Sequence, residues 1–292
     1  MKFCRTIRIW IACLWSATII FSSAMAQAIN VMSNQFVNVD GVNIHYRSGG
    51  NGPFLLLLHG FTLSNEQWEP FYEKFFKQYT VIAPDFLGHG KSDRLDTPFS
   101  YDRWAGIMFH FLDSLNIDET SAIGHSAGAI TLLHMLEQNS HRFRSVVLIS
   151  GALRMSSEGI NILKEDSYEK ANQGMQSYYL KIHFNDRQRI DSVFSDIRLM
   201  AQQFPTEQVE ISSSLSSLSS CTVPVFLIWG ERDVYFPVEI ALELYNNLPD
   251  VRLWVIPGQG HTPVWEAMGG DKQASASFPD RVMEFFDRST GK

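Results

Sequence analysis

The feature that most constrains this chain is a repeated alternation of short apolar segments with amphipathic ones. Segment 54–58 is an unbroken apolar run, which suits a strand covered by helices on both faces of a sheet. Segment 66–78 carries aromatic side chains such as Trp68, Phe71 and Phe75 at helical spacing. Repeated units of this kind predict an α/β fold with a mostly parallel, doubly wound sheet and right-handed crossovers.

The same pattern runs along most of the chain. The predicted strands are 36–39, 42–46, 54–58, 80–83, 121–124, 145–149, 225–229 and 251–256. The predicted helices are 66–78, 101–115, 128–138, 238–248 and 278–288. The first two strands form a hairpin, because Asp40-Gly41 between alternating runs is typical of a two-residue turn.

One stretch, 152–222, interrupts the alternation after the sixth strand. It is rich in polar and helix-forming residues, and its serine-rich run 212–220 is typical of a flexible or loosely helical segment. We expect a helical lid above the carboxyl edge of the sheet, where ligands bind in such folds. Four aromatic side chains of the lid either line an apolar pocket or pack the lid onto the core: Tyr168, Tyr178, Tyr179 and Phe184.

The first 26 residues have the three parts of a secretory signal peptide. A basic start precedes a 13-residue apolar run, 9–21, and an ending with Ala24 and Ala26. The run is short for a membrane span, which needs roughly 17–25 residues. We predict a signal peptide over 1–26, cleaved after Ala26, and one exported domain over 27–292, periplasmic or secreted and without a stable membrane span. An uncleaved anchor or a buried first helix is the alternative.

Composition excludes several other classes of protein. With 45% hydrophobic and 19% charged residues the 292-residue chain can bury a core and is not disordered. Its 24 Lys+Arg against 31 Asp+Glu give a net charge of −7, which argues against nucleic-acid binding. Signal cleavage would leave 266 residues with a net charge of −10. It would remove Cys4 and Cys13 and leave Cys221 without an internal disulfide partner.

A candidate nucleophile stands between a predicted strand and a predicted helix. Gly124-His125-Ser126-Ala127-Gly128 fits the Gly-x-Ser-x-Gly pattern, whose glycines permit a tight turn that lifts the serine hydroxyl above the sheet. The sequence therefore predicts Ser126 as a nucleophile.

A serine hydroxyl needs a base, and the base needs an anion that fixes its tautomer. His261 lies in a glycine-containing loop after the last predicted strand. Glu231 and Asp233 both follow the preceding strand, and Asp233 is the better placed of the two. The order Ser126, Asp233, His261 is the chain order of α/β-hydrolase triads.

An oxyanion hole requires backbone N–H groups aimed at the developing negative charge. Phe61, in the turn after the third strand, and Ala127, at the start of a helix, are the predicted donors. In this interpretation His59 is a structural residue of the turn, and His125 is a packing or hydrogen-bonding neighbour.

With these pieces together, the chain resembles the α/β-hydrolase superfamily, specifically its lid-bearing serine hydrolases of the esterase and lipase type. The resemblance runs from about 36 to 286 and rests on five motifs in the expected order: 59–61, 84–92, 124–128, 230–233 and 260–263. In the family, 85–92 is a structural loop after the fourth strand. Its Gly-Lys-Ser is not a phosphate loop, because the first glycine of that motif would fall at Asp85.

The chain departs from the family pattern after the catalytic histidine. Residues 267–277 separate Glu266 from Phe278-Pro279, where relatives have an early proline and then the last helix. We interpret Gly269 to Ser277 as a small insertion that alters the local pocket shape.

The predicted reaction is attack of Ser126 on a carbonyl carbon, followed by hydrolysis of the acyl-enzyme. A carboxylic ester with a small or medium acyl group is the leading substrate. A C–C bond hydrolase, an amidase or peptidase, an acyltransferase or a cofactor-free haloperoxidase-like protein would use the same residues. A non-catalytic ligand-binding relative is the hypothesis from another class. Haloalkane dehalogenases and epoxide hydrolases are disfavoured, because the resemblance implies an aspartate nucleophile for them.

No metal-ligand spacing and no dinucleotide fingerprint occurs in the sequence. We therefore predict no cofactor and no metal, and a small molecule with an acyl or carbonyl group as the partner. The sequence makes no prediction of the oligomeric state.

Overall fold

The computed structural model describes residues 32–94, 99–203, 209–210 and 215–289. The predicted signal peptide over 1–26 lies outside these residues and remains a prediction. Within the described ranges, no helix combines the length and the apolarity that a bilayer crossing requires.

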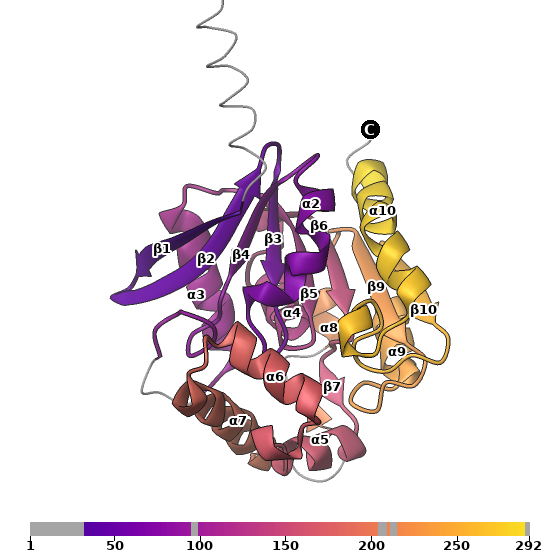
Figure 1. Cartoon of the computed structure of the whole chain (residues 1–292). Coiled ribbons are helices and arrows are strands. Elements are labelled where there is room, and N and C mark those ends of the chain that lie inside the picture. Colours follow the sequence, from indigo (N-terminus) through magenta and orange to yellow (C-terminus); the bar gives the residue numbers. More distant parts are fainter. Residues whose placement is uncertain (1–31, 95–98, 204–208, 211–214, 290–292) are drawn as a thin grey trace, which may run out of the picture.

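An eight-stranded sheet runs through the centre of the molecule in the order β1-β2-β4-β3-β5-β6-β9-β10 (Figure 1). The pairs from β4 to β10 are parallel, and β1 and β2 add an antiparallel hairpin at one edge. This is the predicted α/β-hydrolase fold. The strands are β1 (Ser33–Val39), β2 (Val42–Gly50), β3 (Phe54–Leu58), β4 (Thr80–Pro84), β5 (Thr120–His125), β6 (Phe143–Ile149), β9 (Val225–Gly230) and β10 (Val251–Ile256).

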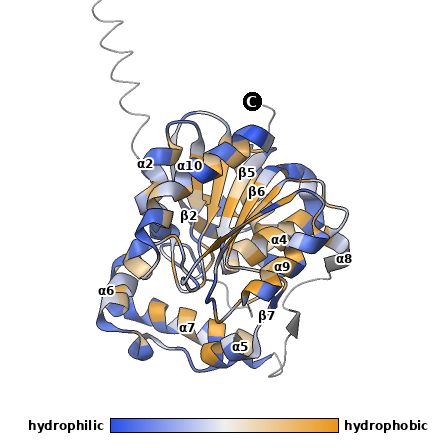
Figure 2. Ribbon diagram, turned by 90° about the vertical axis from the view of Figure 1, so that its right-hand side faces the viewer, coloured by the Kyte–Doolittle hydropathy of each residue, from blue (hydrophilic) through white to orange (hydrophobic). Residues whose placement is uncertain are grey.

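Helices cover both faces of the sheet, so the central strands are apolar on both sides (Figure 2). Leu56 and Leu58 of β3 pack on the side of α3 (Tyr101–Ser114), α4 (Ala127–Asn139) and α9 (Val238–Asn247). Leu55 and Leu57 pack on the opposite side, with the aromatic residues before β4 and with α10 (Lys272–Ser289). Period-two alternation between two buried faces explains the unbroken leucine run.

Between β6 and β9 the chain leaves the sheet and forms a helical layer at its carboxyl edge (Figure 1). This layer contains β7 (Arg154–Met155), α5 (Ser157–Lys164), η3 (Tyr168–Lys170), α6 (Gln173–Ile182), α7 (Arg187–Gln202) and β8 (Val209–Glu210). The short helix α8 (Leu215–Leu218) then returns the chain beside α4 and α9 to the start of β9. Residues 212–214 of the serine-rich run lie outside the described residues.

Three predicted boundaries were wrong. The helix expected over 66–78 is a 3-10 segment, η1 (Asn65–Phe71), followed by the single turn α2 (Tyr72–Phe75), because Pro70 lacks the N–H that a continuous α-helix needs. The second strand, expected over 42–46, extends further, since β2 pairs with β4 through Gly50.

The last helix also begins earlier than predicted, at Lys272, and Pro279 lies inside it. The segment interpreted as an insertion, Gly269 to Ser277, follows the 3-10 turn η4 (Glu266–Met268) and consists of a turn at Gly269 with φ 87° and the start of α10.

Candidate active site

Ser126 occupies the turn between β5 and α4, with φ 52° and ψ −114°. Its N–H donates to the carbonyl of Ile149 at 2.8 Å, which ties the turn to the neighbouring strand. A Cβ on Gly128 would lie 2.3 Å from the carbonyl oxygen of Leu58, and one on Gly124 would lie 2.5 Å from the backbone of Gly128. Only glycines at these two positions permit the turn that raises the Ser126 hydroxyl above the sheet edge.

The three residues predicted as a triad lie in one line of hydrogen bonds. The Oγ of Ser126 is 2.9 Å from Nε2 of His261, and Nδ1 of His261 is 2.9 Å from Oδ2 of Asp233. The Asp233 side chain is fully buried, and its Oδ1 accepts the N–H groups of Tyr235 and Phe236 at 2.9 and 3.1 Å. Asp233 thus has a fixed orientation and a histidine on its second oxygen.

Glu231, the other candidate acid, has a different role. Its Oε2 accepts the N–H of Gly258 at 2.7 Å and so holds the loop after β10. The geometry therefore selects Asp233 from the two acids that the sequence left open.

A second line of hydrogen bonds, centred on Gln67, connects the turn after β3 with the loop of His261. The N–H of Gly60 donates to Oε1 of Gln67 at 2.9 Å, and Nε2 of Gln67 donates to Nδ1 of His125 at 2.9 Å. The remaining ring nitrogen of His125 then carries the proton that is donated to the carbonyl oxygen of His261 at 3.0 Å. Burial, reinforced by His261, lowers the pKa of His125 well below its usual range, so the ring is neutral.

The two predicted oxyanion donors belong to adjoining turns. Gly128 packs against the backbone of Leu58 and His59, which brings the start of α4 beside the turn that holds Phe61. Within the described part of the chain, the N–H groups of Phe61 and Ala127 have no protein acceptor. Both can therefore bind an oxyanion at the helix N-terminus.

His59 is a structural residue of the turn after β3, as expected from the sequence. Its Nδ1 donates to the carbonyl of Gly60 at 2.7 Å, and its Nε2 accepts the N–H of Phe86 at 3.0 Å. Burial lowers the pKa of His59 to about 4, so the ring stays neutral and joins the ends of β3 and β4.

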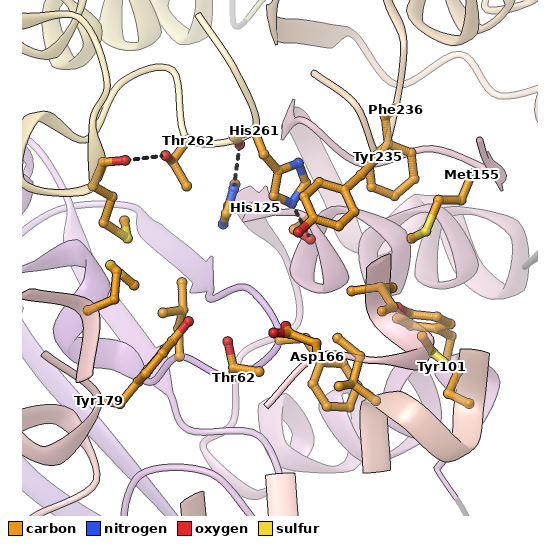
Figure 3. A pocket seen from close by; sticks show the side chains of 18 residues that line it. Thr62, Tyr101, His125, Met155, Asp166, Tyr179, Tyr235, Phe236, His261 and Thr262 are labelled. Atoms are coloured by element: carbon orange, nitrogen blue, oxygen red, sulfur yellow. Dashed lines mark hydrogen bonds between the residues drawn. The ribbon is translucent and has the colours of Figure 1, made fainter. Parts of the chain in front are cut away.

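A cavity of about 140 Å³ opens beside Ser126 and His261, under the helical layer (Figure 3). Its polar lining residues are Thr62, His125, Ser126, Asp166, His261 and Thr262. The others are apolar or aromatic: Phe61, Leu63, Tyr101, Met155, Leu163, Met175, Tyr179, Ile197, Met200, Tyr235, Phe236 and Met268. The sequence did not single out Asp166, because the loop that carries it has no motif.

Of the four lid aromatics considered in the sequence, Tyr179 lines this cavity. Tyr168 lies instead beneath the guanidinium of Arg187, 4.0 Å from ring centre to carbon. Phe184 is 44% exposed and has the ammonium of Lys91 4.0 Å above its ring. Tyr178 is not among the lining residues.

His183, at the end of α6, joins the helical layer to the body. Its Nε2 donates to the carbonyl of Thr62 at 2.9 Å, and its Nδ1 accepts the N–H of Gly90 at 3.2 Å. Thr62 follows Phe61 directly and has φ 64°. The helical layer therefore contacts the backbone of the predicted oxyanion turn through the buried side chain of His183.

The loop containing Gly-Lys-Ser folds around a buried carboxylate. Asp85 accepts the N–H groups of Asn65 and Lys91 at 2.7 and 2.9 Å, and it faces Nδ1 of His45 at 2.7 Å. A carboxylate at its centre is incompatible with phosphate binding. Among the described residues, no group of three His, Cys, Asp or Glu side chains is arranged to hold a metal ion.

Comparison with known proteins agrees with this architecture. The family model of the alpha/beta hydrolase fold matches residues 53–192. Over 264 residues the chain is 26% identical to the 2-hydroxy-6-oxo-6-(2'-aminophenyl)hexa-2,4-dienoic acid hydrolase of Metapseudomonas resinovorans, covering 85% of this chain and 91% of that protein.

Two solved structures share the fold. A bacterial membrane phospholipase A matches with a TM-score of 0.73 at 19% identity, over 100% of this chain and 99% of that one. Carboxylesterase CesB of Bacillus subtilis matches with a TM-score of 0.67 at 20% identity, over 91% and 97% of the two chains.

The chain therefore has the alpha/beta hydrolase fold, and it is similar in sequence to hydrolases. The names of these similar proteins cover several activities, so the substrate has to be inferred from the pocket.

Proposed function

We propose that this protein is a serine hydrolase that cleaves carboxylic esters through an acyl-enzyme. The observation that carries the proposal is the continuous line from Ser126 Oγ through His261 to Asp233, with both contacts at 2.9 Å. A hydroxyl, an imidazole and a buried carboxylate at these distances form an activated nucleophile.

Each residue has a definite part in the proposed reaction. His261 takes the proton of Ser126 as the hydroxyl attacks the carbonyl carbon, and Asp233 stabilises the imidazolium that forms. The N–H groups of Phe61 and Ala127 bind the oxyanion of the tetrahedral intermediate. His261 then gives its proton to the leaving alcohol, and a water molecule activated by the same imidazole releases the acid.

The cavity favours a small or medium acyl group. Its volume of about 140 Å³ lies below the roughly 300–1,000 Å³ of sites that enclose drug-sized ligands. The apolar lining beside Ser126 suits the hydrocarbon part of such a group.

Similarity to a dienoic acid hydrolase favours a second candidate, cleavage of a C–C bond in a substrate that carries a carboxylate. The carboxylate of Asp166 lies in the cavity, and it would repel a second carboxylate in a partly desolvated space. An ester without a carboxylate avoids this repulsion and fits the pocket better.

The test is labelling by a fluorophosphonate probe, which reacts with activated serines, followed by turnover of p-nitrophenyl esters from acetate to palmitate. We expect the parent protein to be labelled and Ser126→Ala not to be. We also expect kcat/KM to be highest for short and medium acyl chains. Equal labelling of both proteins would contradict the assignment of Ser126. The C–C candidate is assayed with 2-hydroxy-6-oxo-6-phenylhexa-2,4-dienoate, the compound named for a similar hydrolase. A labelled protein that cleaves this dienoate but none of the esters would favour the C–C candidate.

We further propose that the protein is exported, on the basis of its N-terminal sequence. The test is the mass of the protein recovered from a host with a general secretion pathway. Removal of residues 1–26 supports export, whereas an intact N-terminus in the cytoplasmic fraction contradicts it.

A further inference from the structure

Asp166 places an acid in the wall of an otherwise largely apolar cavity. It lies in the loop between α5 and η3, in the helical layer, whereas the triad comes from the sheet edge. Figure 3 shows the Asp166 side chain facing the same space as Thr62, Tyr235 and His261. A substrate that acylates Ser126 therefore occupies a cavity whose wall carries a carboxylate.

The surroundings of Asp166 leave its charge only partly compensated. Burial raises the pKa of the Asp166 carboxyl, while the N–H of Ser167 and the charges of Arg198 and Lys170 act in the opposite direction. Arg198 directs a hydrogen bond to the backbone carbonyl of Asp166, at 2.7 Å from Nη1. Burial therefore makes the Asp166 carboxylate less stable than it would be in water, and a cation inside the cavity would stabilise it.

Two aromatic rings of the same cavity lie within electrostatic reach of Asp166. Burial raises the pKa of Tyr235 to about 12, and the charge of Asp166 adds to that rise. Burial also raises the pKa of Tyr179, again with a contribution from Asp166. Both phenols therefore stay protonated, and their rings line the same cavity as Asp166, where an aromatic ring can attract a cation.

The charge of the whole protein acts in the same direction. A net charge of −7 favours the approach of cations over that of anions. Carboxylate, aromatic rings and net charge thus all select for positive charge in the substrate.

We infer that Asp166, with Tyr179 and Tyr235, forms a subsite for a protonated amine, so the preferred substrates are esters whose acyl part carries an ammonium group. This inference rests on the proposed hydrolase function and names the substrate class of that site. Asp166 is a specificity-determining residue in this scheme, distinct from the residues that act on the carbonyl.

The experiment compares matched pairs of esters that differ only in charge. Methyl 3-aminopropanoate is paired with methyl butanoate, and methyl 6-aminohexanoate with methyl heptanoate, because each pair has the same number of heavy atoms. We expect the parent protein to prefer the amino ester of at least one pair by roughly tenfold or more in kcat/KM. In Asp166→Asn, which keeps the shape and removes the charge, this preference should fall to near unity.

Glu165→Gln is the matched control. Glu165 is the adjacent acid, its side chain is 77% exposed, and it does not line the cavity. Its replacement removes the same charge from the same loop, so it should leave the amine preference unchanged. Equal losses in both variants would assign the preference to long-range charge and overturn the subsite.

A second measurement needs no variant. Propylammonium should inhibit hydrolysis of methyl butanoate competitively, at concentrations roughly tenfold or more below those of propanol. Equal inhibition, or no preference for either amino ester in a protein that the fluorophosphonate labels, would overturn the subsite and leave the hydrolase proposal standing. A parent protein that is neither labelled nor active on any ester would overturn both.

Discussion

The sheet edge and the helical layer above it are built by different means. Ser126, Asp233 and His261 are joined by hydrogen bonds that end on buried strands and on backbone N–H groups. In the layer, α6 has Ile182 as its one fully buried residue, and many of the ion pairs there are solvent-exposed. The residues of the proposed triad are thus held by hydrogen bonds to the core, whereas the proposed choice of substrate depends on a layer whose exposed outer surface can change at little cost in stability.

Asp233→Asn should have the largest effect and would test whether the chemistry resides in the sheet edge. An amide can present its N–H₂ to His261, which favours the wrong imidazole tautomer. We therefore expect kcat for ester hydrolysis to fall by about 10⁴-fold while the fold is retained. Steady-state kinetics and circular dichroism check this.

Glu231→Gln is the control for that change. Glu231 lies two residues before Asp233 and holds only the loop at Gly258. The activity of the Glu231→Gln variant should therefore stay close to that of the parent protein. A larger loss from Glu231→Gln than from Asp233→Asn would contradict the assignment of the acid.

Acid pH should weaken the junction between the two regions. His59, His89 and His183 are buried there, and desolvation lowers the pKa of each, that of His59 to about 4. These histidines are harder to protonate in the folded state than in the unfolded state. Their contribution to the free energy of unfolding is therefore fully present above pH about 6.5 and is lost as the pH falls toward about 4. For His59 alone the loss is about 3 kcal/mol. Urea unfolding across this pH range measures it.

His89→Phe sharpens that experiment. Nε2 of His89 is buried without a hydrogen-bond partner among the described residues, and the ring packs against Phe61 and Trp104. Phenylalanine keeps the ring and removes the titrating group, so the unfolding free energy should depend less steeply on acid pH. An unchanged slope would show that His89 contributes nothing to it.

Lys181→Ala should have the smallest effect. Its ammonium lies 3.0 Å from Glu69, but the two side chains are 61% and 52% exposed, so we expect a loss of at most about 0.5 kcal/mol. Ile182→Ala, one residue on but fully buried, should cost about 2–5 kcal/mol. Thermal unfolding of both variants compares them, and equal losses would contradict the distinction between surface and core of the layer.

The centre of the sheet could be predicted from the sequence because its central strands are buried on both faces. Runs such as 54–58 and 225–229 carry a strong local signal, and the triad residues follow such strands in a fixed order. Two helices were predicted less well near prolines: the helix expected over 66–78 is interrupted at Pro70, and the helix expected from Phe278 begins at Lys272 with Pro279 inside it.

The residues that shape the cavity could not be predicted in the same way. Gln67, Asp166 and His183 act through contacts with residues far along the chain, such as Gln67 with His125 and His183 with Thr62. No local pattern marks such residues. The role of Gln67 depends on how the turn after β3 meets His125, and the roles of Asp166 and His183 depend on how the helical layer folds back onto the sheet.

The backbone conformation of Ser126 bears on which amino acid is most stable at this position. At φ 52° and ψ −114° an L-residue is strained, by about 1–3 kcal/mol, whereas glycine adopts such angles freely. Ser126→Gly would therefore give a more stable turn without a hydroxyl. Selection for stability alone would favour glycine at position 126. A serine at this position therefore costs stability, and the proposed nucleophilic role of its oxygen atom accounts for its presence.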